Sequence, residues 1–209
     1  MTFFGLYKKN NNFSQSGQDQ FAHNLSGFNG LYLEIGANDP IINSNTFNLE
    51  IKCKWKGISI EKDETFKKAW DIASNRKNEI IWDDAFNIDY SKLVKDKNFP
   101  NKFDYLSCDI EPAENTFNIL KKIIRSGLSF SYISYEHDKY NIGDKYEKMS
   151  NEFLRTYDYK VAIKDVFSRD KKYKIFETWF VKNDIDFKMI DYLTWKKQFY
   201  KKNKFNLQF

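Results

Sequence analysis

Acidic side chains stand at the ends of several short apolar runs in this 209-residue chain. They are Glu34, Glu61, Asp84, Asp109 and Glu111. In an open α/β sheet the ligand binds beyond the carboxyl ends of the strands, so residues that end successive strands meet at one edge. A single carboxylate of this kind is often a solvated helix cap, whereas carboxylates after successive strands predict a shared binding site.

A glycine turn follows the first of these runs, in Glu34-Ile35-Gly36-Ala37-Asn38-Asp39. Gly36 permits a tight turn and a close approach of the backbone to a ligand. Glu34 can accept a hydrogen bond from a cationic amino group, and it would repel a pyrophosphate. The G-x-G-x-x-G dinucleotide pattern is absent, because Asn38 and Asp39 stand where further glycines would be. The turn therefore favours S-adenosyl-L-methionine (SAM) over a dinucleotide, and a purely structural tight turn is the competing interpretation.

Two further acidic positions fit the rest of such a cofactor. Glu61 follows Glu34 at about the 20–30 residue spacing that separates a glycine loop from the acidic residue on the ribose hydroxyls. Asp83-Asp84-Ala85 follows the next apolar run and suits the adenine amino group.

The elements that must position these residues alternate between short β-branched runs and helical patterns, which predicts βαβ units. Strands are expected at 31–35, 57–61, 79–82, 103–109, 130–135, 159–164 and 174–181, and helices at about 45–53, 64–75, 113–125 and 146–156. We predict an α/β fold with a Rossmann-like seven-stranded, mostly parallel sheet, an antiparallel last strand and helices on both faces.

Composition is consistent with one soluble domain over residues 1–209. The chain is 41% hydrophobic and 18% aromatic, which excludes an intrinsically disordered protein. Its two cysteines form no Cys-x-x-Cys or Cys/His cluster, which argues against a zinc site or a disulfide scaffold. No apolar run approaches the roughly 20 residues of a membrane span, and no secretion signal is visible, so we expect a cytoplasmic protein.

Taken in order, four motifs resemble the FkbM family of class I SAM-dependent methyltransferases. They are Ser14-Gln15-x-Gly17-Gln18-Asp19, Glu34-Ile35-Gly36-Ala37-Asn38, Ile60-Glu61 and Asp109-Ile110-Glu111-x-Ala113-Glu114. The resemblance spans about residues 14–181. It implies a sheet whose seventh strand inserts antiparallel between the fifth and sixth. It also implies O-methylation of a hydroxyl on a small molecule or glycan, with SAM bound by Gln18, Glu34, Gly36, Ala37, Asn38, Asp39, Glu61, Asp84, Ala85 and Asp109.

Three arrangements could remove the proton from the acceptor hydroxyl. In the first, His137 is the general base, oriented by its acidic neighbours Glu136 and Asp138. In the second, Asp109, Glu111 and His137 bind Mg or Mn, which lowers the pKa of the hydroxyl.

In the third arrangement, Lys164 and Glu177 join Asp109 in a lysine–aspartate–lysine–glutamate set like that of RNA 2′-O-methyltransferases. Lys8 and Lys9 are the candidates for its first lysine. An exposed cross-strand ion pair is the competing interpretation of Lys164 and Glu177.

The two ends of the chain carry further predictions. Residues 1–27 are expected to form a loop and a helix capped by Ser16. Residues 183–209 are expected to form a basic, aromatic segment, in which 195–209 is a terminal helix whose aromatic side chains pack on the domain. Exposed aromatic side chains there would favour a homodimer; they are Tyr192, Trp195, Phe199 and Tyr200. The interleaved lysines keep RNA open as a partner, in an RNA cap or 2′-O-methyltransferase. A non-catalytic Rossmann-fold binding protein is the other alternative.

Overall fold

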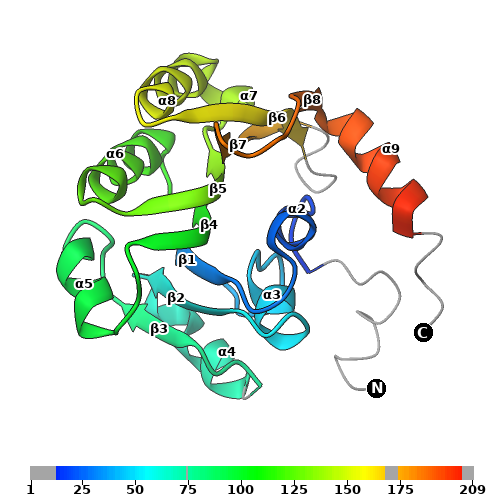
Figure 1. Ribbon diagram of the computed structural model, residues 1–209. Coiled ribbons are helices and arrows are strands. Elements are labelled where there is room, and N and C mark those ends of the chain that lie inside the picture. The colour runs from blue at the N-terminus through cyan, green and yellow to red at the C-terminus, as the bar shows by residue number, and fades with distance from the viewer. Residues whose placement is uncertain (1–12, 74, 168–173, 204–209) are drawn as a thin grey trace.

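The structure is a computed structural model that describes residues 13–73, 75–167 and 174–203, and the side chains up to residue 198. Its centre is one twisted sheet flanked by helices on both faces (Figure 1). No helix in these ranges is long and apolar enough to cross a membrane.

Eight strands form the sheet in the order β3-β2-β1-β4-β5-β7-β6-β8. Their bounds are β1 (Leu31–Ile35), β2 (Lys56–Glu61), β3 (Glu79–Trp82), β4 (Lys102–Cys108), β5 (Ser129–Glu136), β6 (Tyr159–Phe167), β7 (Ile175–Lys182) and β8 (Ile190–Asp191). The first five strands pair in parallel. Strand β7 lies antiparallel between β5 and β6, as the sequence predicted.

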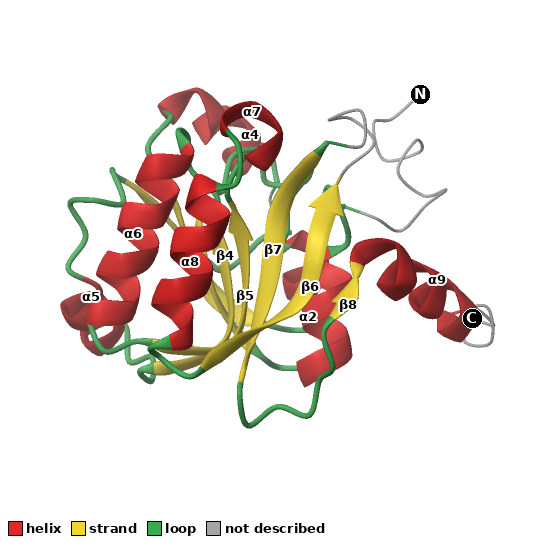
Figure 2. Ribbon diagram, turned by 90° about the horizontal axis from the view of Figure 1, so that it is seen from above, coloured by secondary structure: helices red, strands yellow, loops and turns green. Residues whose placement is uncertain are grey.

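Helices cover both faces of this sheet. Their bounds are α2 (Gln18–Ser26), α3 (Phe47–Ile51), α4 (Lys67–Ile72) after a 3-10 turn (Glu64–Phe66), α5 (Tyr90–Asp96), α6 (Ala113–Arg125), α7 (Lys139–Ile142), α8 (Lys145–Arg155) and α9 (Tyr192–Asn203). Figure 2 shows α5, α6 and α8 side by side on one face and α2 and α9 on the other. The predicted α/β fold is confirmed.

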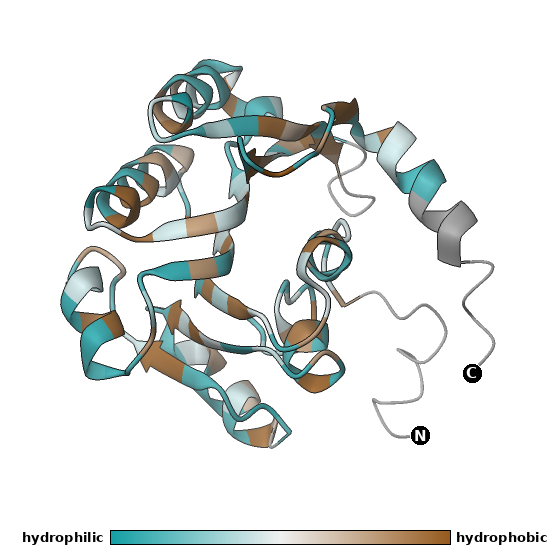
Figure 3. Ribbon diagram, in the orientation of Figure 1, coloured by the Kyte–Doolittle hydropathy of each residue, from teal (hydrophilic) through white to brown (hydrophobic). Residues whose placement is uncertain are grey.

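Alternation along the strands divides the core in two, because successive side chains of a strand point to opposite faces. Leu33 and Ile35 pack with the α5, α6 and α8 face, whereas Tyr32 packs with α2 and α3 on the other. The strands are accordingly rich in apolar residues, which Figure 3 shows as brown segments along the sheet.

The second of these faces is built from large aromatic rings. Tyr32, Tyr105 and Tyr132 stand side by side on β1, β4 and β5 and are fully buried. Gly57 on β2 leaves room for the first of them, since a Cβ there would lie 2.5 Å from the Tyr32 ring. Space for this tyrosine row therefore depends on a glycine in the neighbouring strand.

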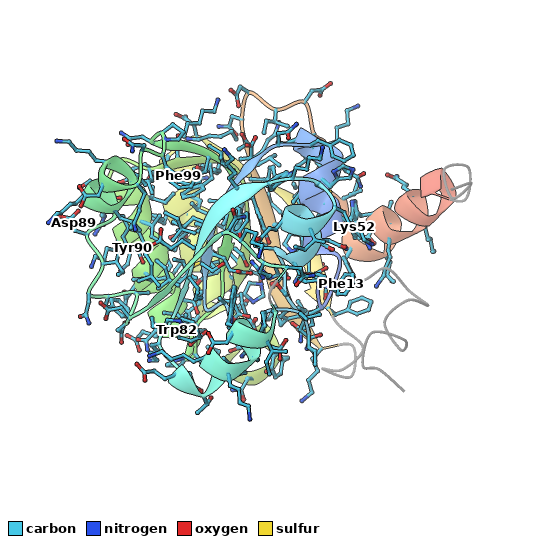
Figure 4. The ribbon with its side chains drawn as sticks, turned by 90° about the horizontal axis from the view of Figure 1, so that it is seen from below. Phe13, Lys52, Trp82, Asp89, Tyr90 and Phe99 are labelled. Carbon is cyan, nitrogen blue, oxygen red and sulfur yellow. The ribbon has the colours of Figure 1, made fainter. Side chains whose placement is uncertain are left out.

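The structure differs from the predicted elements in several places. A two-residue strand, β8, pairs in parallel with β6, so the sheet has eight strands and not seven. Helix α5 was not predicted; Asp89 caps it by accepting a hydrogen bond from the Lys92 amide, and Tyr90 is buried beneath it. Figure 4 shows Asp89 pointing away from the molecule while Tyr90 points inward. The helix expected at 64–75 ends earlier, at Ile72.

The two ends of the described chain pack together on one face. Helix α2 begins after Gly17, whose φ of 96° is left-handed. The Ser16 hydroxyl donates to the Phe167 carbonyl and accepts no hydrogen bond from the helix amides. Phe13 lies beside Lys52, 5.5 Å from its ammonium (Figure 4). Serine capping by Ser16 is therefore wrong.

Tyr192 and Trp195 of α9 are 1% and 6% exposed, so the prediction that these aromatics are exposed is also wrong. Their rings pack against Trp179 of β7, at centroid distances of 5.9 and 5.0 Å. Phe199 and Tyr200 have side chains outside the described part. The aromatic residues of α9 that the structure describes therefore anchor the helix to the sheet.

Trp179 is central to this packing, because it also contacts Phe21 of α2 at 4.9 Å. We predict that Trp179→Ala lowers the free energy of unfolding by about 3–5 kcal/mol, through lost burial and the cavity left behind. Urea unfolding measures this loss. The control is Leu193→Ala, whose side chain is 52% exposed and whose loss should stay within about 0.5 kcal/mol. Equal losses in the two variants would contradict the assignment.

Candidate functional site

A cavity of about 490 Å³ opens at the carboxyl ends of β1 to β5. In the sheet, β1 lies between β2 and β4, so the strand order changes direction between β1 and β4. The cavity lies at this switch point. Most of the residues predicted to bind the cofactor line it. They are Glu34, Gly36, Ala37, Asn38, Asp39, Glu61, Asp84, Ala85 and Asp109, with Glu111 beside them.

Gly36 lines this cavity at the turn after β1. Its φ of 77° is left-handed, and a Cβ there would lie 1.7 Å from the Asp109 carbonyl oxygen. The amide of Asp109 in turn donates to the Ile35 carbonyl at 3.1 Å. Only glycine allows the ends of β1 and β4 to approach this closely.

Glu61 holds the two loops that border the cavity on the β2 side. Its Oε2 accepts a hydrogen bond from the Asn38 amide and its Oε1 one from the Asp63 amide, both at 2.8 Å. The carboxylate is 8% exposed. It therefore fixes the loop after β1 and presents its remaining lone pairs to the cavity.

Glu34 lies deeper, only 2% exposed, and also lines the cavity. Its Oε2 accepts hydrogen bonds from Thr46 Oγ1 at 2.8 Å and Ser59 Oγ at 2.7 Å. Its Oε1 accepts none from the described residues. The pKa of Glu34 is raised, chiefly by burial and further by Glu50, although Arg76, Ser59 and Thr46 oppose the shift. One oxygen of a buried carboxylate is thus left for a ligand.

At the end of β3, the acidic pair organises its own loop. Asp83 Oδ1 accepts from the Asp84 amide at 2.7 Å, and Asp84 Oδ1 accepts from the Phe86 amide at 2.9 Å. Lys62 lies 3.9 Å from Asp84 in a partly exposed ion pair.

The cavity is strongly acidic although the whole chain carries a net charge of +5. Nine carboxylates line it: Glu34, Asp39, Glu61, Asp63, Asp83, Asp84, Asp109, Glu111 and Glu136. Lys62 is the one cation among its described lining residues. Such a cavity attracts a cationic ligand and repels phosphate groups.

His137 does not line this cavity. It is fully buried, its Nε2 lies 3.1 Å from Thr178 Oγ1, and its Nδ1 accepts from the Lys139 amide at 3.2 Å. Burial, together with the charge of Lys139, lowers its pKa to about 3. The imidazole is therefore neutral at physiological pH, and both its nitrogens are engaged by the protein.

The predicted metal ligands Asp109, Glu111 and His137 are not brought together. The first two line the cavity, and the third lies outside it. Within the described ranges, no three His, Cys, Asp or Glu side chains form a group that could hold a metal ion.

The lysine–glutamate set is not assembled either. Lys164 is exposed in the middle of β6, opposite Asp191 of β8, because β6 continues to Phe167. Glu177 is buried, where its Oε2 accepts from Gln18 Nε2 at 2.9 Å and Trp179 Nε1 at 2.7 Å. Gln18, Lys164 and Glu177 do not line the cavity, and Lys8 and Lys9 lie outside the described residues.

Other lining residues were not predicted as site residues. They include Gln15, Asn43 and Asn45, together with Glu136, which was predicted only to orient His137. Asn45 Nδ2 donates to Ser107 Oγ at 3.0 Å, and its buried Oδ1 accepts no hydrogen bond from the described part of the chain. Gln15 belongs to a motif that the sequence displayed, whereas Asn45 reaches the cavity only because the loop after β1 folds back.

No family model matches the chain, and no curated protein matches it in sequence. Solved structures match it in fold. The METTL16 MTase domain superposes with a TM-score of 0.53 at 13% identity, over 80% of this chain and 66% of that one. Human methyltransferase 10 domain containing protein gives 0.51 at 11% identity, over 80% of each chain. Spermidine synthase from Thermotoga maritima gives 0.51 at 18% identity, over 82% of this chain.

The chain spans only part of some matching structures. It covers 59% of the spermidine synthase chain and 39% of the chain in another matching structure, that of EvdMO1. At such low identity, these likenesses show the fold alone. The chain has the Rossmann-like fold of the class I methyltransferases, with the antiparallel β7 inserted beside β5.

The close approach at Gly36 generates a stability prediction. Gly127 also has a left-handed φ, 90°, but nothing lies within 4 Å of a Cβ there. Gly127→Ala should therefore cost only the backbone strain of about 1–2 kcal/mol. Gly36→Ala should cost more, since the Asp109 carbonyl must move. Urea unfolding of both variants measures the difference, and equal losses would show that the close approach is unimportant.

Burial of His137 predicts a pH dependence. The unfolded chain binds a proton at His137 below about pH 6.5, which the folded chain takes up only near pH 3. Because of His137, the free energy of unfolding therefore decreases as the pH falls from about 6.5 towards 3. Between pH 6.5 and 4, the free energy of unfolding should fall less steeply in His137→Gln than in the wild type. His23→Gln reports the effect of removing the other histidine. Parallel slopes for His137→Gln and the wild type would refute the prediction.

Proposed function

We propose that the chain is a SAM-dependent O-methyltransferase that acts on a hydroxyl of a small molecule or glycan. The observation that carries the proposal is the acidic cavity at the switch point, with Glu34 Oε1 left open beside Gly36. SAM carries a sulfonium and an ammonium group, and this lining suits both. The methyltransferase fold supports the proposal, and the FkbM assignment remains a prediction.

The residues present fit the cofactor. Glu34 Oε1 would accept a hydrogen bond from the amino group of the methionine moiety, and Gly36 leaves room for the ligand against the backbone. Glu61 would hold the ribose hydroxyls, and Asp84 the adenine amino group. When bound, SAM supplies an electrophilic methyl group on its sulfonium sulfur.

The proton acceptor is best assigned to Asp109. Of the four residues predicted to be catalytic, Asp109 alone lines the cavity, whereas His137, Lys164 and Glu177 do not. In this assignment, the Asp109 carboxylate accepts the proton of the acceptor hydroxyl and orients the hydroxyl oxygen. The cofactor would supply the methyl group from its sulfonium sulfur and leave as S-adenosylhomocysteine.

The cavity favours a small, uncharged or cationic acceptor. Its volume of about 490 Å³ lies within the roughly 300–1,000 Å³ range of small-molecule sites. The amides of Gln15, Asn43 and Asn45 can pair with hydroxyl groups, while the carboxylates would repel the phosphates of RNA. A small polyhydroxyl acceptor therefore fits better than RNA.

Calorimetry tests the cofactor. We expect measurable binding of SAM or S-adenosylhomocysteine to the wild type. Glu34→Gln should weaken it about tenfold or more, because it removes a charge-assisted hydrogen bond. Absence of binding of both ligands to the folded wild type would leave a non-catalytic Rossmann-fold protein as the better interpretation.

A methyl-transfer assay over a panel of sugars and small alcohols tests the proton acceptor. We predict that Asp109→Asn lowers kcat about 10²- to 10⁴-fold, the usual contribution of a general base, and leaves the dissociation constant of SAM within about tenfold. His137→Gln is the matched comparison and should stay within about threefold of the wild type, because its imidazole is sealed from the cavity. If His137→Gln were inactive and Asp109→Asn active, the assignment would be wrong.

A further inference from the structure

Arg76 is a buried arginine with a complete set of protein partners. It lies in the loop between α4 and β3 and is 8% exposed. Its Nε donates to Glu50 Oε2 at 2.8 Å. Its two other nitrogens donate to the Pro40 carbonyl and to the hydroxyls of Ser44, Tyr32 and Thr46, at 2.8–3.2 Å. These five bonds account for all five N–H groups of the guanidinium.

Three of the partners belong to the loop that borders the cavity after β1. The Pro40 carbonyl and the Ser44 and Thr46 hydroxyls fix the path of residues 40–46. The guanidinium also stacks on Trp70, 4.4 Å from the ring centroid, and the Trp70 indole donates to the Asn38 carbonyl at 2.9 Å. Arg76 therefore fixes the conformation of the loop that borders the cavity after β1.

Thr46 connects Arg76 to Glu34. Its hydroxyl accepts from Arg76 Nη2 at 2.8 Å and donates to Glu34 Oε2 at 2.8 Å. A direct approach of 3.9 Å between Arg76 Nη2 and Glu34 Oε2 adds to this relay. Ser59 donates to the same Oε2 but does not touch Arg76.

The buried charges do not cancel. When both carboxyl groups are ionised, Glu34 and Glu50 bring two negative charges against the one positive charge of Arg76, and the side chains are 2–9% exposed. A buried, uncompensated charge is costly, and a cation placed at Glu34 Oε1 would complete the neutralisation. The open side of this network is the side that lines the cavity.

We propose that Arg76 is a positioning residue that, through Thr46, keeps Glu34 as a carboxylate with Oε1 directed at a cationic group in the cavity. The proposal rests on the proposed function for the identity of that group, the amino group of SAM. Arg76 itself touches neither the ligand nor the reacting atoms.

The groups around Glu34 set the expected pH behaviour. Arg76 faces it from the α4–β3 loop, Glu50 from α3, and Tyr32 and Tyr105 from β1 and β4. Burial raises the pKa of Glu34, and Arg76 is the largest opposing influence. The pKa of Arg76 is itself raised: burial alone would lower it, but Tyr32, Glu34 and Glu50 outweigh that effect. Removing Arg76 should therefore move the titration of Glu34 to higher pH.

The deciding experiment is a pH titration of the ligand-free protein, in which carbon-13 NMR follows the Glu34 side-chain carboxyl. Its signal is assigned by its absence in Glu34→Gln. We expect a higher midpoint in Arg76→Met than in the wild type, and a midpoint near that of the wild type in Arg76→Lys, which keeps the charge. Arg155→Met, which removes an exposed arginine, is the control and should change nothing. An unchanged midpoint in folded Arg76→Met overturns the proposal.

A second pair of variants decides the question if Arg76→Met does not fold. Thr46→Val and Ser59→Ala each delete one hydroxyl donor to Glu34 Oε2, but only Thr46 also contacts Arg76. The midpoint should rise more in Thr46→Val than in Ser59→Ala. Equal shifts would show that the relay to Arg76 has no role.

Calorimetry with SAM then tests the consequence. In Thr46→Val and Arg76→Met, SAM binding should weaken about tenfold or more at low pH and recover as the pH rises through the midpoint that the NMR titration gives for Glu34 in each variant. A wild type that binds no SAM would overturn the proposed function, while the titration of Glu34 would still decide the role of Arg76.

Discussion

The site depends on one close contact, between the turn after β1 and the end of β4. Gly36 lies against the Asp109 carbonyl with no room for a Cβ, and the Asp109 amide completes the contact by donating to Ile35. These two strands lie at the switch point of the sheet, where the loops diverge and leave a cavity. If this contact were looser, the carboxylates of β1, β2 and β4 would not face one volume.

Electrostatics gives that volume its character. The chain carries an excess of lysine, yet its cavity is lined by carboxylates. Buried hydroxyls and Arg76 stabilise the deepest of these, Glu34, and backbone amides stabilise Glu61. These hydrogen bonds fix the positions of the carboxylates that face the cavity. Among the described lining residues, carboxylates far outnumber cations. This arrangement suits a cationic cofactor and an acceptor without phosphate.

The face of the sheet that α2 and α9 cover is an aromatic packing face. Helix α2, strand β7 and helix α9 meet there around Trp179, with the rings of Phe21 and Trp195 against it. Glu177 and Gln18 are used within this packing, where they bond to one another. Polar residues that stand near strand ends can therefore belong to the core of the fold, because the helix that covers them removes them from the cavity.

Local sequence determined the fold class, most strand positions and the acidic ends of β1 to β4, because alternation and glycine turns are properties of neighbouring residues. Tertiary structure decided which polar residues share the cavity. Gln15 and Asn45 reach the cavity because their loops fold over it. His137 lies outside the cavity, buried and hydrogen-bonded to Thr178, and Lys164 lies outside it on the exposed side of β6, which is longer than predicted. Arg76 carried no sequence signal, since its partners come from four separate segments that only the folded chain brings together.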